Sequence, residues 1–140
     1  MPISDLLDLF QAAVDLVNFY WNFYVIGIVA VLGWLFSLKR NLTPRQRIIL
    51  TGVYVGFIVL NLLALMNSYR FMEAARLDAL GEIPAGTLPH LSRMLTSISF
   101  ANQQWMGWII HIVVDSMVIA AIWLFHVEPE ATPAEPIHSA

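Results

Sequence analysis

Residues 107–125, GWIIHIVVDSMVIAAIWLF, decide the fold class of this chain. An apolar run of about 20 residues is the length that crosses the hydrocarbon core of a bilayer as a helix. His111 and Asp115 interrupt this run, one helical turn apart and close to its middle. Ionisable groups are costly at that depth, and they face the interior of a bundle or a water-filled path. The stretch therefore predicts a membrane helix with one face turned toward protein or water, away from lipid.

The composition of the whole chain also indicates a membrane protein. Of its 140 residues 59% are hydrophobic and 12% are charged, whereas a soluble domain carries roughly a quarter charged residues. We predict three spans, at about 19–38, 48–66 and 106–125, within one membrane domain, 1–128. The chain has no cysteine, which excludes thiolate metal sites, and its net charge of −3 includes no basic patch that would suit a nucleic acid partner.

Local signals place the ends of the helices. We predict helices over 4–39, 43–81 and 87–128. The second begins with TPRQ, in which Thr43 and the glutamine three residues later form a capping box around a proline at the first helical position. The third ends before a proline, because the residue that precedes a proline disfavours helix. Residues 129–140 are rich in Pro and Glu and predict a disordered cytoplasmic tail.

Each predicted helix is longer than one bilayer crossing, and the excess falls on one side. Segments 4–18, 67–82 and 87–105 therefore predict a helical extension outside the membrane. Four cations crowd the connection between the first two spans: Lys39, Arg40, Arg45 and Arg47. The positive-inside rule then places this connection and the tail in the cytoplasm, and the N-terminus and the extension on the non-cytoplasmic side. We expect the membrane to be the bacterial cytoplasmic (inner) membrane.

Polar residues predict which face of each span turns toward protein. Residues 3, 4, 7 or 11 positions apart share one face of a helix. The predicted ion path or polar seam has members on all three spans: Asn22, Tyr54, Asn61, Ser68, Gln104, His111 and Asp115. At about 1.5 Å per residue, Asn22, Asn61 and His111 reach similar depths, so we expect both asparagines to bond to His111.

The second span carries a further packing signal on its opposite side. Gly52 and Gly56 form a GxxxG pair, and small residues at this spacing allow another membrane helix to approach closely. This helix then has two sides that face protein, which favours a homo-oligomer or a subunit of a larger membrane complex.

Two interpretations of His111 and Asp115 follow from their depth. Polar groups in hydrocarbon seek partners, so the pair can hold helices together, or it can mark a route for protons or cations. Below Asp115 the same face continues as Val118, Ile119 and Ile122, with no polar continuation. Our leading hypothesis is therefore an accessory or scaffolding subunit without chemistry of its own. The alternative is a small homo-oligomeric channel for protons or cations, lined by His111 and Asp115.

Enzymatic function has little support in the sequence. It contains no Walker loop, HExxH, GxSxG or CxxC motif, so we expect neither catalysis nor a metal or cofactor. A third hypothesis is a haem-binding or other membrane enzyme subunit. It depends on His111, the histidine within a span, as an axial ligand, and a second histidine ligand would have to come from another subunit.

Overall fold

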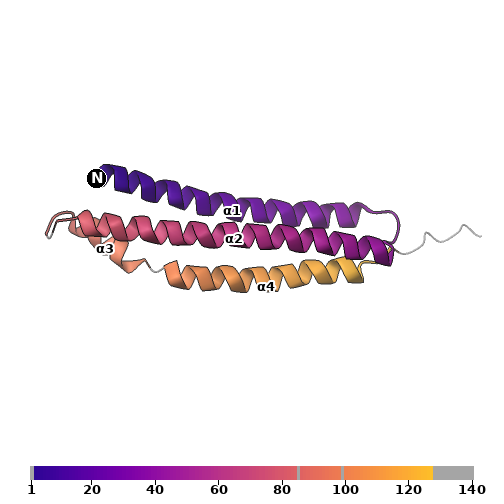
Figure 1. Ribbon diagram of the computed structural model, residues 1–140. Coiled ribbons are helices and arrows are strands. Elements are labelled where there is room, and N and C mark those ends of the chain that lie inside the picture. Colours follow the sequence, from indigo (N-terminus) through magenta and orange to yellow (C-terminus); the bar gives the residue numbers. More distant parts are fainter. Residues whose placement is uncertain (1, 85, 99, 128–140) are drawn as a thin grey trace, which may run out of the picture.

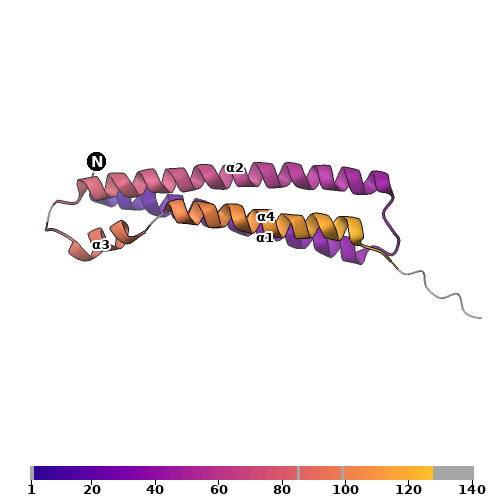
Figure 2. The same ribbon diagram turned by 90° about the horizontal axis from the view of Figure 1, so that it is seen from below.

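Regular structure is entirely helical in the part of the chain that the computed structural model describes, residues 2–84, 86–98 and 100–127. The elements in this part are α1 (Ile3–Ser37), α2 (Pro44–Glu82), α3 (Pro89–Ser97) and α4 (Phe100–Leu124). The long helix α2 runs between α1 and α4 in Figure 1. The perpendicular view in Figure 2 shows α2 to one side of both, so the three long helices form a triangular bundle. The short α3 packs against the far end of α2.

The membrane assignment is confirmed. Within the described residues, three helices are long and apolar enough to cross a bilayer, and they lie over Ile3–Ser37, Pro44–Glu82 and Gln103–Leu124. Large apolar side chains cover the outside of the bundle, and Ile26 and Leu60 are 66% and 71% exposed. An exterior of this kind would drive a soluble protein to aggregate, whereas lipid solvates it. The chain is therefore a membrane-embedded bundle of helices, as its composition predicts.

The predicted start of α2 is confirmed in atomic detail. The Thr43 side chain accepts a hydrogen bond from the backbone N–H of Gln46, and the Gln46 side chain accepts one from the Thr43 N–H at 2.9 Å. Pro44 occupies the first helical position, where its missing N–H is not needed. Both ends of α1 and α2 fall within about two residues of the predicted bounds, which is the usual uncertainty of a helix end.

The predicted third helix is wrong as one continuous element. The structure divides it, because α3 ends at Ser97, Ile98 is extended with φ −83° and ψ 127°, and α4 begins at Phe100. Thr96 and Ser97 donate their hydroxyl groups to carbonyl oxygens of their own helix. Such hydroxyl and β-branched residues compete with the backbone bonds of a helix and lower its propensity. The break lets α3 leave the line of α4 and pack against α2, beside which it lies in Figure 1.

The last helix also ends earlier than predicted, at Leu124. Arg47 donates a hydrogen bond to the Phe125 carbonyl at 3.0 Å, and Asn41 binds both backbone groups of Val127. These side chains satisfy the backbone groups that a further helical turn would otherwise pair. The contacts also tie the α1–α2 connection to the end of α4. The predicted disordered tail, 129–140, lies outside the described residues.

The bundle interior is layered along its axis. Three apolar clusters contribute most of it: first Leu6, Ala79 and Leu95; then Val17, Leu65 and Met72 with their neighbours; and at the other end Leu35, Val118 and Ile122 with theirs. A layer of polar side chains separates the second cluster from the third, and this layer holds the candidate site.

Candidate functional site

Asp115 is the centre of the polar layer. Its Oδ1 accepts hydrogen bonds from the hydroxyl groups of Tyr24 at 2.9 Å and Tyr54 at 2.8 Å. Its Oδ2 lies 3.2 Å from Nδ1 of His111. Tyr24 belongs to α1, Tyr54 to α2, and the other two residues to α4, so one carboxyl group joins all three long helices. We call these four residues the Asp115 cluster.

Helical periodicity explains why these side chains point inward. His111 and Asp115 are four residues apart, so they share the face of α4 that continues to Val118. Tyr24 lies seven positions after the buried Val17, which places both on the inner face of α1. His111 is 1% exposed and Asp115 is 6% exposed, so both turn toward protein and away from lipid. That orientation is what the sequence predicted for this pair.

Aromatic rings enclose the imidazole of His111. The ring centroid of Tyr24 lies 4.0 Å from that of His111, and the Trp21 centroid lies 5.6 Å away. Trp21 is held in place because its Nε1 donates a hydrogen bond to the Tyr69 hydroxyl at 3.0 Å. His111 and Asp115 are buried among these side chains, so electrostatic interactions within the Asp115 cluster act in a low-dielectric setting.

Two buried atoms of the polar layer lack a hydrogen-bond partner among the described residues. They are Nε2 of His111 and Oδ1 of Asn61. Nδ1 of His111 contacts Asp115, so Nε2 is the ring nitrogen without a partner among the described residues. Buried polar atoms without a partner are uncommon in folded proteins, and such atoms suit a bound water molecule.

The structure brings together three of the predicted seam residues, Tyr54, His111 and Asp115. Asn61 and Ser68 are buried on α2 but bond elsewhere, since Asn61 Nδ2 donates to the Tyr20 carbonyl at 3.1 Å and Ser68 donates within its own helix. Gln104 is half-buried, beside Tyr69 and outside the Asp115 cluster.

The predicted bonds from Asn22 and Asn61 to His111 are wrong. Asn61 bonds to the Tyr20 carbonyl, and Asn22 is exposed on the outer face of α1. Each helical residue rotates by about 100°, so two positions carry a side chain to nearly the opposite face. With Tyr24 turned inward, Asn22 has to point outward.

Tyr24 is the member of the Asp115 cluster that sequence reasoning missed. The prediction for α1 followed its polar residue Asn22, whereas the inner face is the apolar one that contains Ala13, Val17 and Leu35. Tyr24 falls on that apolar face and brings a hydroxyl group to it. The available signal was therefore the spacing of the apolar residues, with a tyrosine at the same period.

The GxxxG pair does not bring the helices of this chain together. Gly52 and Gly56 are exposed, and a Cβ added to either would meet nothing within 4 Å in the described part of the chain. The contact between α1 and α2 that requires a glycine is instead at Gly27, where an added Cβ would overlap the ring of Phe57. The GxxxG face therefore points away from this chain's own bundle.

A second polar contact joins α2 and α3. Arg76 of α2 is 9% exposed, and it donates to the Leu95 carbonyl of α3 at 2.8 Å. It also donates two hydrogen bonds to the carboxyl group of Glu73, at 2.6 and 2.8 Å. This guanidinium links α3 to α2, so its role is structural.

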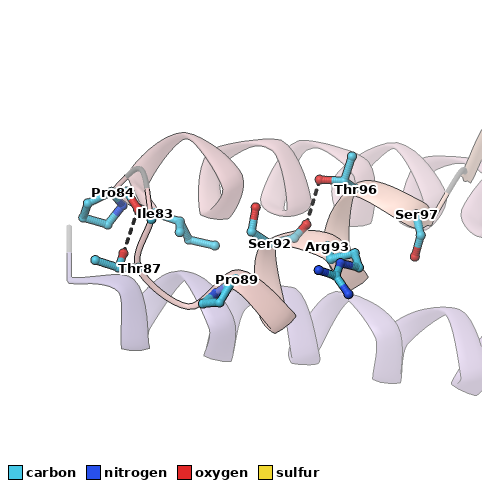
Figure 3. A pocket seen from close by; sticks show the side chains of 9 residues that line it. Ile83, Pro84, Thr87, Pro89, Ser92, Arg93, Thr96 and Ser97 are labelled. Atoms are coloured by element: carbon cyan, nitrogen blue, oxygen red, sulfur yellow. Dashed lines mark hydrogen bonds between the residues drawn. The ribbon is translucent and has the colours of Figure 1, made fainter.

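A cavity of about 500 Å³ lies beside α3 (Figure 3). The hydroxyl groups of Thr87 and Thr96 line it, but they donate to the carbonyl groups of Pro84 and Ser92, drawn as dashed lines. Among the described residues that line it, Arg93 is the ionisable one. Polar groups do not converge here as they do at Asp115, so the Asp115 cluster remains the candidate site.

Comparison with known proteins adds no relative. No protein family model, curated protein or solved structure matches the chain. No group of three or more His, Cys, Asp or Glu side chains stands at metal-binding distance within the segments that the structure describes. The function has to be inferred from the geometry of the side chains themselves.

Proposed function

We propose that this chain is an accessory or scaffolding subunit of a membrane assembly, held rigid by the Asp115 cluster. The observation that supports it is the use of Asp115: both of its oxygens contact groups of the same chain, drawn from all three long helices. Hydrogen bonds of this kind hold membrane helices in register, and unpaired groups in hydrocarbon are costly. A carboxyl group that binds side chains of all three helices holds these helices together, and we call this role a clamp.

The apolar layers on both sides of the Asp115 cluster support the same proposal. Leu65 and Met72 lie on the side of the extension, and Leu35 and Ile122 lie on the other side. A path for protons or cations needs polar groups or water through these layers. The Asp115 cluster is a polar layer between two apolar layers, which suits a structural role.

The proposal also includes the orientation of the chain in the membrane and the surface at which it meets its partner. The Lys39–Arg47 connection lies in the cytoplasm and the extension on the opposite side of a bacterial inner membrane, as the positive-inside rule favours. Gly52 and Gly56 offer an exposed surface at which a helix of a second copy or of another subunit packs closely.

One observation favours a proton or cation channel as the second candidate. Nε2 of His111 is buried without a partner in the described part of the chain, where an imidazole can take up a proton. His111 and Asp115 face α1 and α2 of their own chain, so such a path runs inside each protomer rather than along an axis between protomers. A haem at His111, the third candidate, requires these helices to separate, because the chain's own atoms enclose Nε2.

Flux measurements on the reconstituted chain test the proposal. We expect sealed vesicles that contain the protein to pass protons and potassium ions no faster than protein-free vesicles, measured with an internal pH dye under an imposed gradient. We also expect the chain to leave its native membrane in mild detergent as a complex of mass above its own 15.8 kDa.

The decisive variant is Asp115→Asn, with Ser116→Ala as its neighbour-matched control on the exposed side of α4. The scaffold proposal would be overturned in favour of the channel by a proton or cation flux through the wild-type protein that is lost in Asp115→Asn and kept in Ser116→Ala. The size of the complex has to be the same in all three proteins.

A further inference from the structure

A groove of about 350 Å³ opens on the outer surface of the bundle, between the end of α1 and the start of α2. Its walls are almost entirely apolar and come from both helices and their connection: Trp34, Leu38, Leu42, Leu50 and Val53. Trp34 and Val53 are exposed, so the groove is open to the surrounding lipid. Its size falls in the lower part of the range of ligand pockets, about 300–1,000 Å³.

Positive charge gathers at one end of this groove. Arg40 is the charged residue among those that line it, and the neighbouring Lys39 and Arg45 are exposed. No Asp or Glu occurs in the sequence between Asp15 and Glu73. The ion pairs within the described residues involve other groups, Arg76 with Glu73 and His111 with Asp115. The cations around the groove therefore lack anionic partners among the described residues.

Depth places these two features at the edge of the membrane. The walls lie in the last turns of the first apolar run and the first turns of the second, while Lys39 and Arg40 follow directly beyond. A tryptophan such as Trp34 is typical of the boundary between hydrocarbon and headgroups. An apolar groove in the hydrocarbon thus continues into a cationic rim at headgroup level.

We propose that this groove is a binding site for one anionic phospholipid. An acyl chain lies along the walls at Leu38 and Leu50, and the headgroup phosphate meets the guanidinium of Arg40. A guanidinium matches a phosphate with two parallel hydrogen bonds. The acyl chain moves from hydrocarbon into an apolar groove and gains little hydrophobic free energy, so selectivity comes from the charge of the headgroup.

Native mass spectrometry of the full chain tests this site. Purified protein is titrated with phosphatidylglycerol or phosphatidylcholine of identical acyl chains. We expect one phosphatidylglycerol molecule to be retained more tightly than phosphatidylcholine. Arg40→Gln should lower that preference about fivefold, the usual contribution of one cation near an anionic membrane surface.

Matched variants distinguish a specific lipid-binding site from general electrostatic attraction between anionic lipids and the protein. Arg93→Gln removes an exposed cation at the opposite end of the bundle and should leave the preference unchanged. Val53→Trp fills the groove from an exposed position and should weaken retention of the lipid, whereas Val59→Trp, exposed on the same helix outside the groove, should not. Far-UV circular dichroism confirms that each variant remains helical.

Three results would overturn the proposal. The first is equal retention of the two lipids by the wild-type chain. The second is an equal loss of the preference for phosphatidylglycerol in Arg40→Gln and Arg93→Gln. The third is a rise in the unfolding temperature with inorganic phosphate alone that equals the rise with phosphatidylglycerol, which would identify a site for the free ion. None of these outcomes bears on whether the Asp115 cluster acts as a clamp, so this proposal and the scaffold proposal fail separately.

Discussion

At Asp115 one carboxyl group satisfies donors from two other helices. Tyr24 and Tyr54 donate to the same oxygen, Oδ1, while His111 faces Oδ2. In membrane proteins an interhelical hydrogen bond contributes about 0.6 kcal/mol on average and up to about 1.7. Because the two tyrosine hydroxyls share one acceptor, each continues to satisfy it when the other is removed.

This shared acceptor predicts that the losses in unfolding free energy are not additive in a double-mutant cycle. Tyr24→Phe and Tyr54→Phe should each lower the free energy of unfolding by about 0.6–1.7 kcal/mol. The double variant should lose more than the sum, since Oδ1 is then buried without a donor. Unfolding titrations in mixed micelles measure all four free energies. Tyr20→Phe serves as the control, because the Tyr20 hydroxyl has no hydrogen bond within the described residues. A double loss equal to the sum of the single losses would contradict the shared acceptor.

At the scale of helices, α2 organises the bundle because it contacts each of the others. Its capping box starts it sharply at Pro44, and Arg76 near its far end holds α3. Its contact with α1 depends on a residue that carries no side chain. Gly27 of α1 provides the space into which the ring of Phe57 fits.

The Gly27–Phe57 contact predicts a difference between two glycines of the same helix. Gly27→Ala should lower the free energy of unfolding by about 1 kcal/mol, the lower end of the cost of overpacking, because the far end of the half-buried Phe57 ring can shift. Gly33→Ala adds its methyl group where nothing lies within 4 Å in the described part of the chain, so it should not destabilise the protein.

A smaller partner should rescue the first of these variants. Phe57→Leu combined with Gly27→Ala should recover part of the lost free energy, because the shortened side chain vacates the space of the new methyl group. The same unfolding titrations measure this recovery. Equal stability of Gly27→Ala and Gly33→Ala would contradict overpacking against Phe57 at Gly27.

At the scale of the whole molecule, the chain is polar inside at one level and apolar outside along most of its length. Hydrogen bonding therefore holds the bundle from within, while the exterior remains available to lipid and to other helices. Three helices bury limited surface among themselves, and the exposed face at Gly52 and Gly56 can bury more in an assembly.

Assembly should accordingly respond to a substitution that the isolated chain tolerates. Gly56→Leu should reduce the mass of the complex in mild detergent, measured by light scattering after size exclusion, because a bulky side chain blocks close approach of a partner helix. The unfolding free energy of the chain should not fall, since an added Cβ at Gly56 meets nothing within 4 Å in the described residues and leucine favours a helix more than glycine does. Gly33→Leu, on the exposed side of α1, is the control and should leave the mass unchanged. Identical masses for the complexes of wild type and Gly56→Leu would show that the face at Gly52 and Gly56 takes no part in the assembly.

The sequence by itself determined the features that depend on neighbours along the chain. Composition and apolar run length determined the membrane class, because lipid rather than a partner segment selects for them. Adjacent residues determined the capping box at Thr43, and i,i+4 spacing put His111 and Asp115 on one face. Each of these signals is complete within a few turns of helix.

Only the tertiary structure decided how the helices are rotated and aligned against one another. It turned Tyr24 inward and Asn22 outward, brought Tyr54 to Asp115 across 61 residues of sequence, and turned Gly52 and Gly56 away from the bundle. Rotation and register are set jointly by packing over the full length of three helices, so one helix's polar stripe does not specify its inner face. Because each residue rotates the helix by about 100°, an inner face assigned one or two residues away from the true one has a different set of partners.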